Sequence, residues 1–161
     1  MTSARPDILC VGAVLWDVIG RSPAPMAPGA DVPGRIRHVP GGVALNVAVA
    51  LAAREQSVAV LGAVGADPEG DALLAAVRAL GVATDWMQRL PEWPTDIYMA
   101  IEDTHGLIAA VADAHSLEAA GHRVLAPLRD GTFGVTAEAE ELDDDLVEQV
   151  VEHRFDPVEA A

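Results

Sequence analysis

The sequence predicts an α/β fold in which a largely parallel sheet carries helices on its faces. Short, continuously apolar runs alternate along the chain with longer runs of helical periodicity, and this alternation is typical of parallel sheets. Aromatic residues make up only 4% of the 161 residues, and alanine, valine and leucine supply most of the apolar content. That composition favours helices packed on buried strands over a β-sandwich. The length suits one domain.

The first predicted strand is the apolar run DILCVGAV at residues 7–14. Asp17 follows three residues later and is therefore expected just past the carboxyl end of this strand, where open α/β sheets bind ligands. Residues 21–33 contain four prolines and fit neither a helix nor a central strand. The weakly alternating run RIRHV, residues 35–39, is expected to be an exposed edge strand.

A helix is predicted to begin after the pair Gly41-Gly42 and to run to about Glu55, within the segment PGGVALNVAVALAARE. The run is apolar almost all the way round, so this helix is expected to be buried. Its one amide, Asn46, lies in the first turn. A buried polar group without a partner costs about 1–3 kcal/mol, so Asn46 is expected to bind protein backbone or a ligand hydroxyl. Glycines at the helix start also allow close backbone approach to free N–H groups.

The next segments continue the alternation of strand and helix. Residues 57–64 are expected to form a second buried strand, and residues 85–90 a third. Between them lies a helix with Asp67 as N-cap and Gly81 as its stop. Its predicted apolar face comprises Leu73, Leu74, Val77 and Leu80.

Two strand-like runs follow, residues 96–102 and 106–113, joined by a hairpin turn at DTHG. A last helix is predicted over residues 116–128, with Ser116 as its cap. The hairpin and the proline-rich excursion do not fit the main sheet. They are expected to form a small second sheet that projects from it.

The net charge of −15 argues against the phosphate backbone of a nucleic acid as a partner. Residues 138–161 contain ten acidic residues and one basic residue, so this segment carries −9 of the net charge of −15. Residues 131–161 are thus an acidic tail of different character from the body. Within it Leu142, Leu146 and Val150 have the spacing of one amphipathic helix.

The single cysteine, Cys10, excludes a disulfide within the chain and is typical of the reducing cytosol, so a cytoplasmic location is expected. Cys10 itself is expected to be a core residue. The first apolar run, about eight residues long, is shorter than a signal peptide requires. No segment approaches the roughly 20 apolar residues of a membrane span, and no membrane association is predicted.

Several common kinds of site are not supported by the sequence. The five histidines show no metal-ligand spacing, and Ser116 lacks the G-x-S-x-G context of a hydrolase. The glycines of GAVGADPEG, residues 62–70, match neither G-x-G-x-x-G nor G-x-x-x-x-G-K-[ST]. A structural turn is favoured there over a nucleotide loop. No residue is assigned a catalytic, cofactor-binding or metal-binding role.

Four segments occur in a characteristic order: DILCVGAVLWDVIGR, PGGVALNVAVALA, LGAVGADPEGDALLAAVRALGV and PTDIYMAIEDTHGLIAAVADAH. Together, over about residues 6–128, they resemble the N-terminal half of a ribokinase-type (PfkB family) carbohydrate or nucleoside kinase. The amino-acid sequences of the first two segments are similar to those of pseudouridine kinase-like members of the family. The resemblance implies a ribokinase-like αβα parallel sheet with a small projecting β-lid, built from residues 18–39 and 96–112.

The same resemblance implies that Asp17, Gly41, Gly42 and Asn46 bind the substrate, a sugar or nucleoside. The ancestral reaction it implies is ATP-dependent phosphorylation of a hydroxyl group. Trp16, Tyr98 and Met99 are candidate lid side chains for specificity, although each side-chain type is more often core packing. Lids of this family often pair between subunits, so a homodimer is expected.

The family's phosphoryl-transfer machinery lies in its C-terminal half. A D-T-x-G-A-G-D-like motif there supplies an anion hole and an aspartate base, and the same half holds ATP. The segment of this sequence most similar to that motif is RDGTFG at residues 129–134, and it lacks the Gly-Ala-Gly-Asp core. The resemblance therefore implies a truncated kinase that is inactive alone, with ATP and Mg²⁺ expected only when a complete C-terminal half is present.

Three alternatives remain open from the sequence. The chain is a non-catalytic sugar-binding or dimerisation module, or one chain of a split kinase whose second chain supplies the ATP half. The third alternative, from outside the family, is an acidic interaction protein in which the tail matters most.

Overall fold

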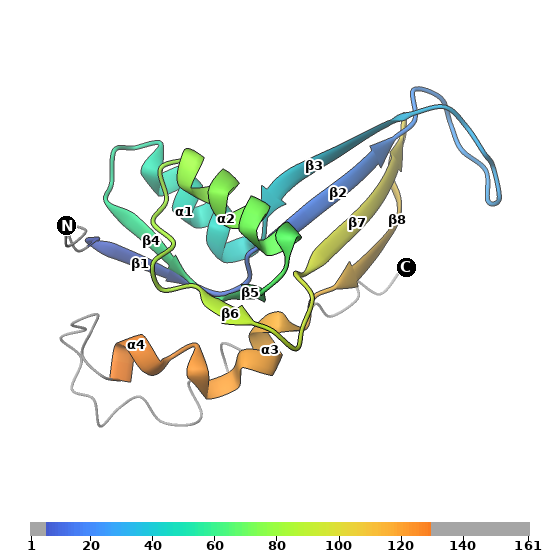
Figure 1. The fold of residues 1–161 in the computed structure, drawn as a ribbon. Helices are drawn as coiled ribbons and strands as arrows, with labels where there is room; N and C mark the ends of the chain where they lie inside the picture. Colours follow the sequence, from blue (N-terminus) through green and yellow to red (C-terminus); the bar gives the residue numbers. More distant parts are fainter. Residues whose placement is uncertain (1–5, 130–161) are drawn as a thin grey trace, which may run out of the picture.

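A computed structural model of the protein describes residues 6–129. Its body is a set of short parallel strands between two layers of helices, and a longer sheet projects from one end of that body (Figure 1). The predicted α/β fold and the predicted projecting sheet are both present. The acidic tail predicted for residues 131–161 lies outside the described residues.

The body contains four short strands paired parallel in twos: β1 (Ile8–Val11) with β4 (Val58–Leu61), and β5 (Ala63–Gly65) with β6 (Gln88–Leu90). The single strand predicted at residues 57–64 is thus two strands. They part at Gly62, where the carbonyl oxygen of Gly12 occupies the position of a side chain. Each half then pairs with a different partner. Similarly, only the last three residues of the strand predicted at 85–90 are extended in β6.

The strand predicted at residues 7–14 is shorter than expected. It ends at Val11 because Gly12 adopts a φ of 147°, a conformation that favours glycine. A new strand, β2 (Leu15–Arg21), begins three residues further on. Asp17 follows the carboxyl end of β1, as expected, but it is the third residue of the separate strand β2, which the sequence did not predict.

Helices cover both faces of the body (Figure 1). On one face lie α1 (Val43–Ala52) and α2 (Pro68–Ala79), and on the other α3 (Ser116–Ala120), the 3₁₀ turn η1 (Gly121–Arg123) and α4 (Ala126–Arg129). The helix predicted over residues 116–128 is therefore divided, since Gly121 has a φ of 51°. His115 occupies the N-cap position predicted for Ser116.

Helix α2 follows its predicted signals. The carboxylate of Asp67 accepts a hydrogen bond from the N–H of Gly70 at 2.8 Å, which caps the helix as predicted. Gly81 follows the helix end with a φ of 83°. Leu80, however, is 45% exposed and does not belong to the buried face.

Helix α1 is buried on one side only, contrary to prediction. Its buried residues are Ala44, Leu45 and Ala48, whereas Val43 and Val47 are 69% and 51% exposed. The helix ends at Ala52 rather than near Glu55, whose φ of 63° is incompatible with a right-handed helix.

Two hydrophobic clusters hold the layers together. One joins α1 and α2 to the sheet and includes Leu45, Val60, Leu73 and Val77. The other joins the opposite face of the sheet to the C-terminal helices and includes Leu61, Leu90, Val124 and Leu125. Val60 and Leu61 are adjacent in β4 and belong to opposite clusters, because successive side chains of a strand point to opposite faces of the sheet. Cys10 is partly buried against the first cluster, consistent with its predicted core role.

The projecting sheet has the strand order β3 (Arg35–Gly41), β2, β7 (Ile97–Asp103), β8 (Gly106–Asp113). We call these four strands the lid sheet. Strands β2 and β7 are parallel, and the two outer pairs are antiparallel. β3 is an edge strand, as predicted, and the proline-rich residues between β2 and β3 are irregular. The predicted hairpin is β7 and β8.

The base of the lid sheet is tied to the body through two acidic residues. The carboxylate of Asp96 accepts hydrogen bonds from the N–H groups of Ser116 (3.0 Å) and His115 (3.2 Å), so it joins the two ends of the hairpin. Asp67 accepts from the N–H of Thr95 at 2.8 Å and also from its hydroxyl. These contacts fix where the lid sheet leaves the body. No helix among residues 6–129 is long and apolar enough to cross a membrane.

Candidate functional site

The carboxylate of Asp17 lies directly over Gly41. A Cβ built on Gly41 would overlap Oδ2 and Cγ of Asp17, so no other residue fits at position 41 while Asp17 keeps this conformation. The two residues come from neighbouring strands, since β2 and β3 are paired with Leu15 opposite Gly41 and Asp17 opposite Val39. Gly41 is therefore the last residue of a strand and leaves room for the Asp17 carboxylate, whereas the sequence predicted only that a helix begins after it.

Gly42 has a separate reason to be glycine. Its φ is 103°, and a Cβ there would overlap the carbonyl oxygen of Ala13. Gly42 is the N-cap of α1, and no side chain caps that helix end. The backbone N–H of Asn46 donates to the carbonyl of Gly42 at 2.9 Å, which closes the first turn. The chain thus passes from the residue under Asp17 straight into the helix that carries Asn46.

Asn46 is exposed, so the prediction that its amide is buried is wrong. The cause is the one-sided burial of α1, described above. Within residues 6–129 the amide of Asn46 has no side-chain hydrogen bond. An exposed amide at a helix start is available to an external hydroxyl, as both donor and acceptor.

The register of the lid sheet places Tyr98 beside Asp17. Tyr98 of β7 is directly opposite Asp17 of β2, and paired residues share one face of a sheet. Trp16 and Met99, the other two specificity candidates, lie on the opposite face. There the Trp16 indole donates to the carbonyl of Glu69 at 3.0 Å and lies 6.3 Å from the ring of His38. Of the three candidates, only Tyr98 shares the Asp17 face.

Burial raises the pKa of the Asp17 carboxyl above its ordinary value. No basic side chain or hydrogen-bond donor among the described residues offsets that burial. At neutral pH an ionised Asp17 is an acceptor only, with room for two hydroxyl groups. The arrangement is thus suited to binding a hydroxyl-bearing ligand.

Residues 6–129 contain no group of three histidine, cysteine, aspartate or glutamate side chains placed to hold a metal ion. The glycines of the GAVGADPEG segment have structural reasons to be small. A Cβ on Gly65 would lie 2.5 Å from the nitrogen of Thr95, and one on Gly70 would overlap the carbonyl of Gly65.

Thr95 and Asp96, which set the position of the lid sheet, are functional positions that the sequence did not predict. Both precede β7, and both are buried. Their roles depend on contacts with Asp67 and Ser116, which are distant in sequence. The one sequence signal for these roles was the presence of two adjacent polar residues, Thr95 and Asp96, at the start of the predicted hairpin.

The chain is similar to known proteins. The sequence profile described as pfkB family carbohydrate kinase matches residues 5–150. Pseudouridine kinase of Escherichia coli (strain K12) is 32% identical over 107 residues, which is 66% of this chain and 34% of that protein. The sugar kinase YeiI of the same organism, described as uncharacterized, is 32% identical over 121 residues, 74% of this chain and 33% of its own length.

Among solved structures, a carbohydrate kinase from Agrobacterium tumefaciens has a TM-score of 0.66 and 28% sequence identity. The match covers 79% of this chain and 42% of that one. The expected ribokinase-like arrangement is therefore shared with a solved carbohydrate kinase. The chain spans 34% and 33% of the lengths of the two curated relatives.

Proposed function

The chain belongs to the pfkB family of carbohydrate kinases, and we propose that its described residues are the substrate-binding part of a kinase for a hydroxyl group of a sugar or nucleoside. In this proposal Asp17 accepts hydrogen bonds from two substrate hydroxyls and Asn46 binds a further one. Gly41 and Gly42 keep the backbone close enough for the substrate to reach both. The ring of Tyr98 lies beside the bound molecule.

The observation that carries the proposal is the carboxylate of Asp17, which lies over Gly41 and has no hydrogen-bond or ion-pair partner within residues 6–129. Burial disfavours its charged form, and no described donor compensates. A partly buried carboxylate kept without a partner has a cost in stability, and such costs are typical of functional sites. A polyhydroxylated ligand supplies the missing donors. A nucleoside is included among the candidate ligands because one relative is named a pseudouridine kinase.

We propose further that the 161-residue chain alone does not transfer phosphate. Phosphoryl transfer depends on positioning and charge stabilisation around the phosphates. The sequence has no Gly-Ala-Gly-Asp segment for that purpose. The chain then functions as a sugar-binding module, or a second chain supplies the ATP-binding half.

The face of the lid sheet opposite Asp17 supports pairing of two copies. Register and alternation place Ile36, Met99, Ile101 and Val111 on that face. They are 72%, 48%, 39% and 69% exposed. A contiguous exposed apolar surface of this kind is typical of an interface, and a second lid sheet presents the same surface. We therefore include a homodimer through the lid sheet in the proposed function.

A turnover assay tests the predicted lack of activity. The purified full chain is incubated with γ-labelled ATP, Mg²⁺ and, in turn, pseudouridine, ribose or fructose. We expect no labelled product above the protein-free blank, whereas the full-length Escherichia coli pseudouridine kinase serves as a positive control with pseudouridine. Labelled sugar or nucleoside formed by this chain would contradict the proposal that it is inactive alone.

A further inference from the structure

Two arginines face each other across neighbouring strands near the outer end of the lid sheet. Arg21, the last residue of β2, is paired with Arg35, the first residue of β3. Arg37 lies two residues further along β3 and therefore on the same face. Like charges directly opposite each other destabilise a sheet. Three guanidinium groups on one face thus have an energetic cost in the isolated chain.

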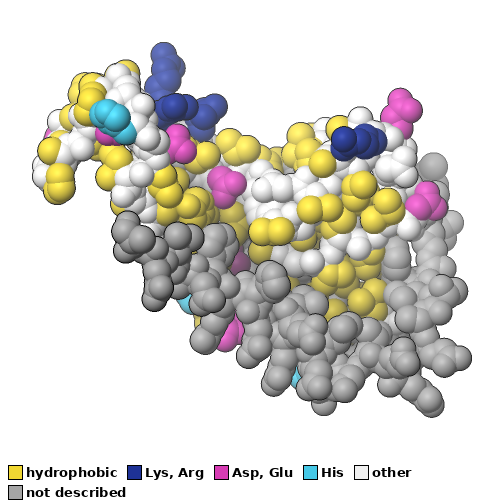
Figure 2. Space-filling model, turned by 180° about the vertical axis from the view of Figure 1, so that it is seen from behind, with side chains coloured by type: hydrophobic (Ala, Val, Ile, Leu, Met, Phe, Trp, Pro, Cys, Tyr) yellow, Lys and Arg dark blue, Asp and Glu magenta, His cyan; other side chains and the backbone are white. Residues whose placement is uncertain are grey.

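Little in the described structure neutralises this cluster. The only acidic side chain that forms an ion pair with it in residues 6–129 is Glu102, whose Oε2 lies 3.9 Å from Nε of Arg21. Arg35 and Arg37 are exposed and have no described partner. Figure 2 shows the basic side chains gathered over the outer part of the lid sheet. This local concentration of positive charge is unusual for a chain that has a net charge of −15 and contains no lysine.

The arginines line a cavity of about 610 Å³. Its other lining residues are Ser22, Pro23, Pro33, Gly34 and Thr104. The size suits a small ligand. A cavity with three unpaired or weakly paired guanidinium groups at its wall is electrostatically suited to an anion.

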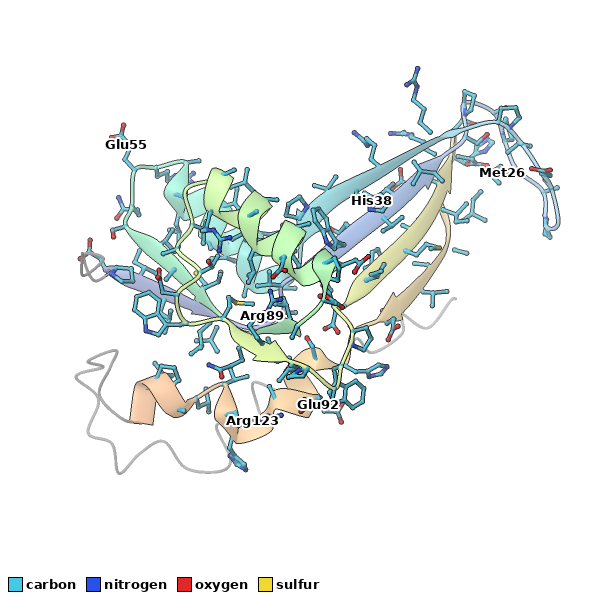
Figure 3. All side chains as sticks on the ribbon, viewed as in Figure 1. Met26, His38, Glu55, Arg89, Glu92 and Arg123 are labelled. Carbon is cyan, nitrogen blue, oxygen red and sulfur yellow. The ribbon has the colours of Figure 1, made fainter. Side chains whose placement is uncertain are left out.

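The loop that forms part of the cavity wall is held in place. The buried carboxylate of Asp103 accepts hydrogen bonds from the N–H of Met26 (2.9 Å) and from the N–H of His105 (2.6 Å). Met26 lies on the loop at the outer end of the lid sheet (Figure 3). At the other end of the loop, Gly34 leaves no room for a side chain, since a Cβ would lie 2.8 Å from the carbonyl oxygen of Arg21. The cavity is therefore preformed rather than dependent on a ligand.

We propose that Arg21, Arg35 and Arg37 form an oxyanion site that binds the phosphate group of a small phosphorylated molecule. Guanidinium groups match phosphate oxygens with paired, charge-assisted hydrogen bonds. The three arginines share the face of the lid sheet that carries Asp17. Arg21 is four residues along β2 from Asp17, about 13 Å at the rise of an extended strand, whereas Arg37 is opposite Ile19, two residues from Asp17. The phosphate site is thus at the outer end of this face, and the proposed sugar site is nearer the body. This inference does not depend on the proposed kinase-type function.

Titration calorimetry of the full chain with inorganic phosphate and with pyrophosphate, at constant ionic strength, tests the site. We expect saturable binding, at least tenfold weaker in the double variant Arg35→Gln/Arg37→Gln. Arg54→Gln, at the exposed end of α1, changes one arginine far from the lid sheet and should bind like the unmodified chain. Absence of binding, or an equal loss in Arg54→Gln, would overturn the proposal.

Ribose 5-phosphate tests whether the arginine site is independent of the sugar site. The alternative is that the arginines bind the phosphate group of a ligand whose sugar lies at Asp17. For a separate site, Asp17→Asn leaves the affinity for inorganic phosphate unchanged, and ribose 5-phosphate binds no more tightly than the tighter of ribose and phosphate alone. If ribose 5-phosphate binds at least tenfold more tightly than either part, and both Asp17→Asn and Arg35→Gln/Arg37→Gln remove that gain, one ligand spans both positions and the separate site is wrong.

Thermal unfolding gives a readout independent of calorimetry. Arg35→Gln should raise the Tm without phosphate, since it removes the opposed like charges. Phosphate should then raise the Tm of the unmodified chain more than that of the variant. An equal phosphate effect on both proteins would contradict the site.

Discussion

The carboxylate of Asp17 occupies the space that a side chain at residue 41 would need. The pairing of β2 with β3 brings the two residues together, and the chain then continues through Gly42 into α1 and Asn46. Gly41 is the last residue of β3. Without a side chain there, the carboxylate of Asp17 lies over the backbone, and neither of its oxygens has a hydrogen-bond partner within residues 6–129.

Replacing Gly41 by alanine should displace the Asp17 carboxylate and weaken sugar or nucleoside binding at least tenfold. Forced overpacking of this kind costs about 1–3 kcal/mol. Gly20→Ala is a matched control in the same sheet, because a Cβ there would lie 3.9 Å from the carbonyl oxygen of Ala100, an ordinary contact. Calorimetric titration with pseudouridine, ribose and fructose compares the two variants. Equal affinities in both would show that Gly41 does not position Asp17.

Asp17→Asn should stabilise the unliganded protein at neutral pH. The pKa of Asp17 is raised in the folded state by burial, so the folded state holds the proton more tightly than the unfolded state does. Stability therefore falls as pH rises from the unfolded pKa through the raised folded pKa. Urea unfolding from pH 3 to pH 7 should show an advantage of the variant that is largest at pH 7 and disappears near pH 3. A variant less stable than the unmodified chain at pH 7 would contradict this account.

Asp67→Ala should lower the free energy of unfolding by about 1–2 kcal/mol, the usual effect of losing a helix cap. It also removes the contacts to Thr95 that tie α2 to the start of β7. Asp71→Ala is the matched control in the same helix turn. It removes an exposed ion pair with Arg89 and should cost less than about 1 kcal/mol. Similar losses in both variants would show that Asp67 is no more than a surface acid.

The Asp67 contacts also predict a pH dependence. Burial alone would raise the pKa of Asp67, but hydrogen bonds from Thr95 and Gly70 outweigh it and the net shift is downward. The stability that Asp67 contributes is therefore present above its unfolded pKa and is lost as pH falls through the lower folded value. The difference between the unmodified chain and Asp67→Ala should shrink below pH 4 in urea unfolding. A difference that stays constant down to pH 2 would contradict the shift.

Val111→Glu should abolish self-association through the lid sheet, because it places a charge in the exposed apolar face. Ala110→Glu introduces the same charge on the neighbouring exposed residue, which faces the Asp17 side. Sedimentation equilibrium should give a dimer for the unmodified chain and for Ala110→Glu, and a monomer for Val111→Glu. A monomeric unmodified chain would exclude the homodimer.

The sequence predicted the order of elements well because the buried strands and helix α2 have local signals. The capping aspartate, the proline after it and the terminal glycine of α2 act within a few residues of the helix ends. β2 was missed because the apolar run continues almost without break from β1. The division between them depends on the positive φ of Gly12, which composition does not reveal.

The candidate site was only partly predictable for the same reason. The spacing of Gly41, Gly42 and Asn46 is local, so their proximity along the chain was evident. The exposure of Asn46 depends on which side of α1 packs against the sheet. The contact of Asp17 with Gly41 and the opposition of Arg21 to Arg35 depend on cross-strand register. Register is set by the whole sheet rather than by any one segment.

Titration of the unmodified full chain with pseudouridine, ribose and fructose, compared with Asp17→Asn and Asn46→Ala, tests the central claim most directly. If the chain is a substrate-binding part of a carbohydrate or nucleoside kinase, at least one of these compounds binds saturably. Both substitutions then weaken it at least tenfold, since each removes hydrogen bonds to a hydroxyl. Binding that is equally strong in all three proteins, or no binding of any of the three compounds, would contradict the assignment of Asp17 and Asn46 to a sugar site.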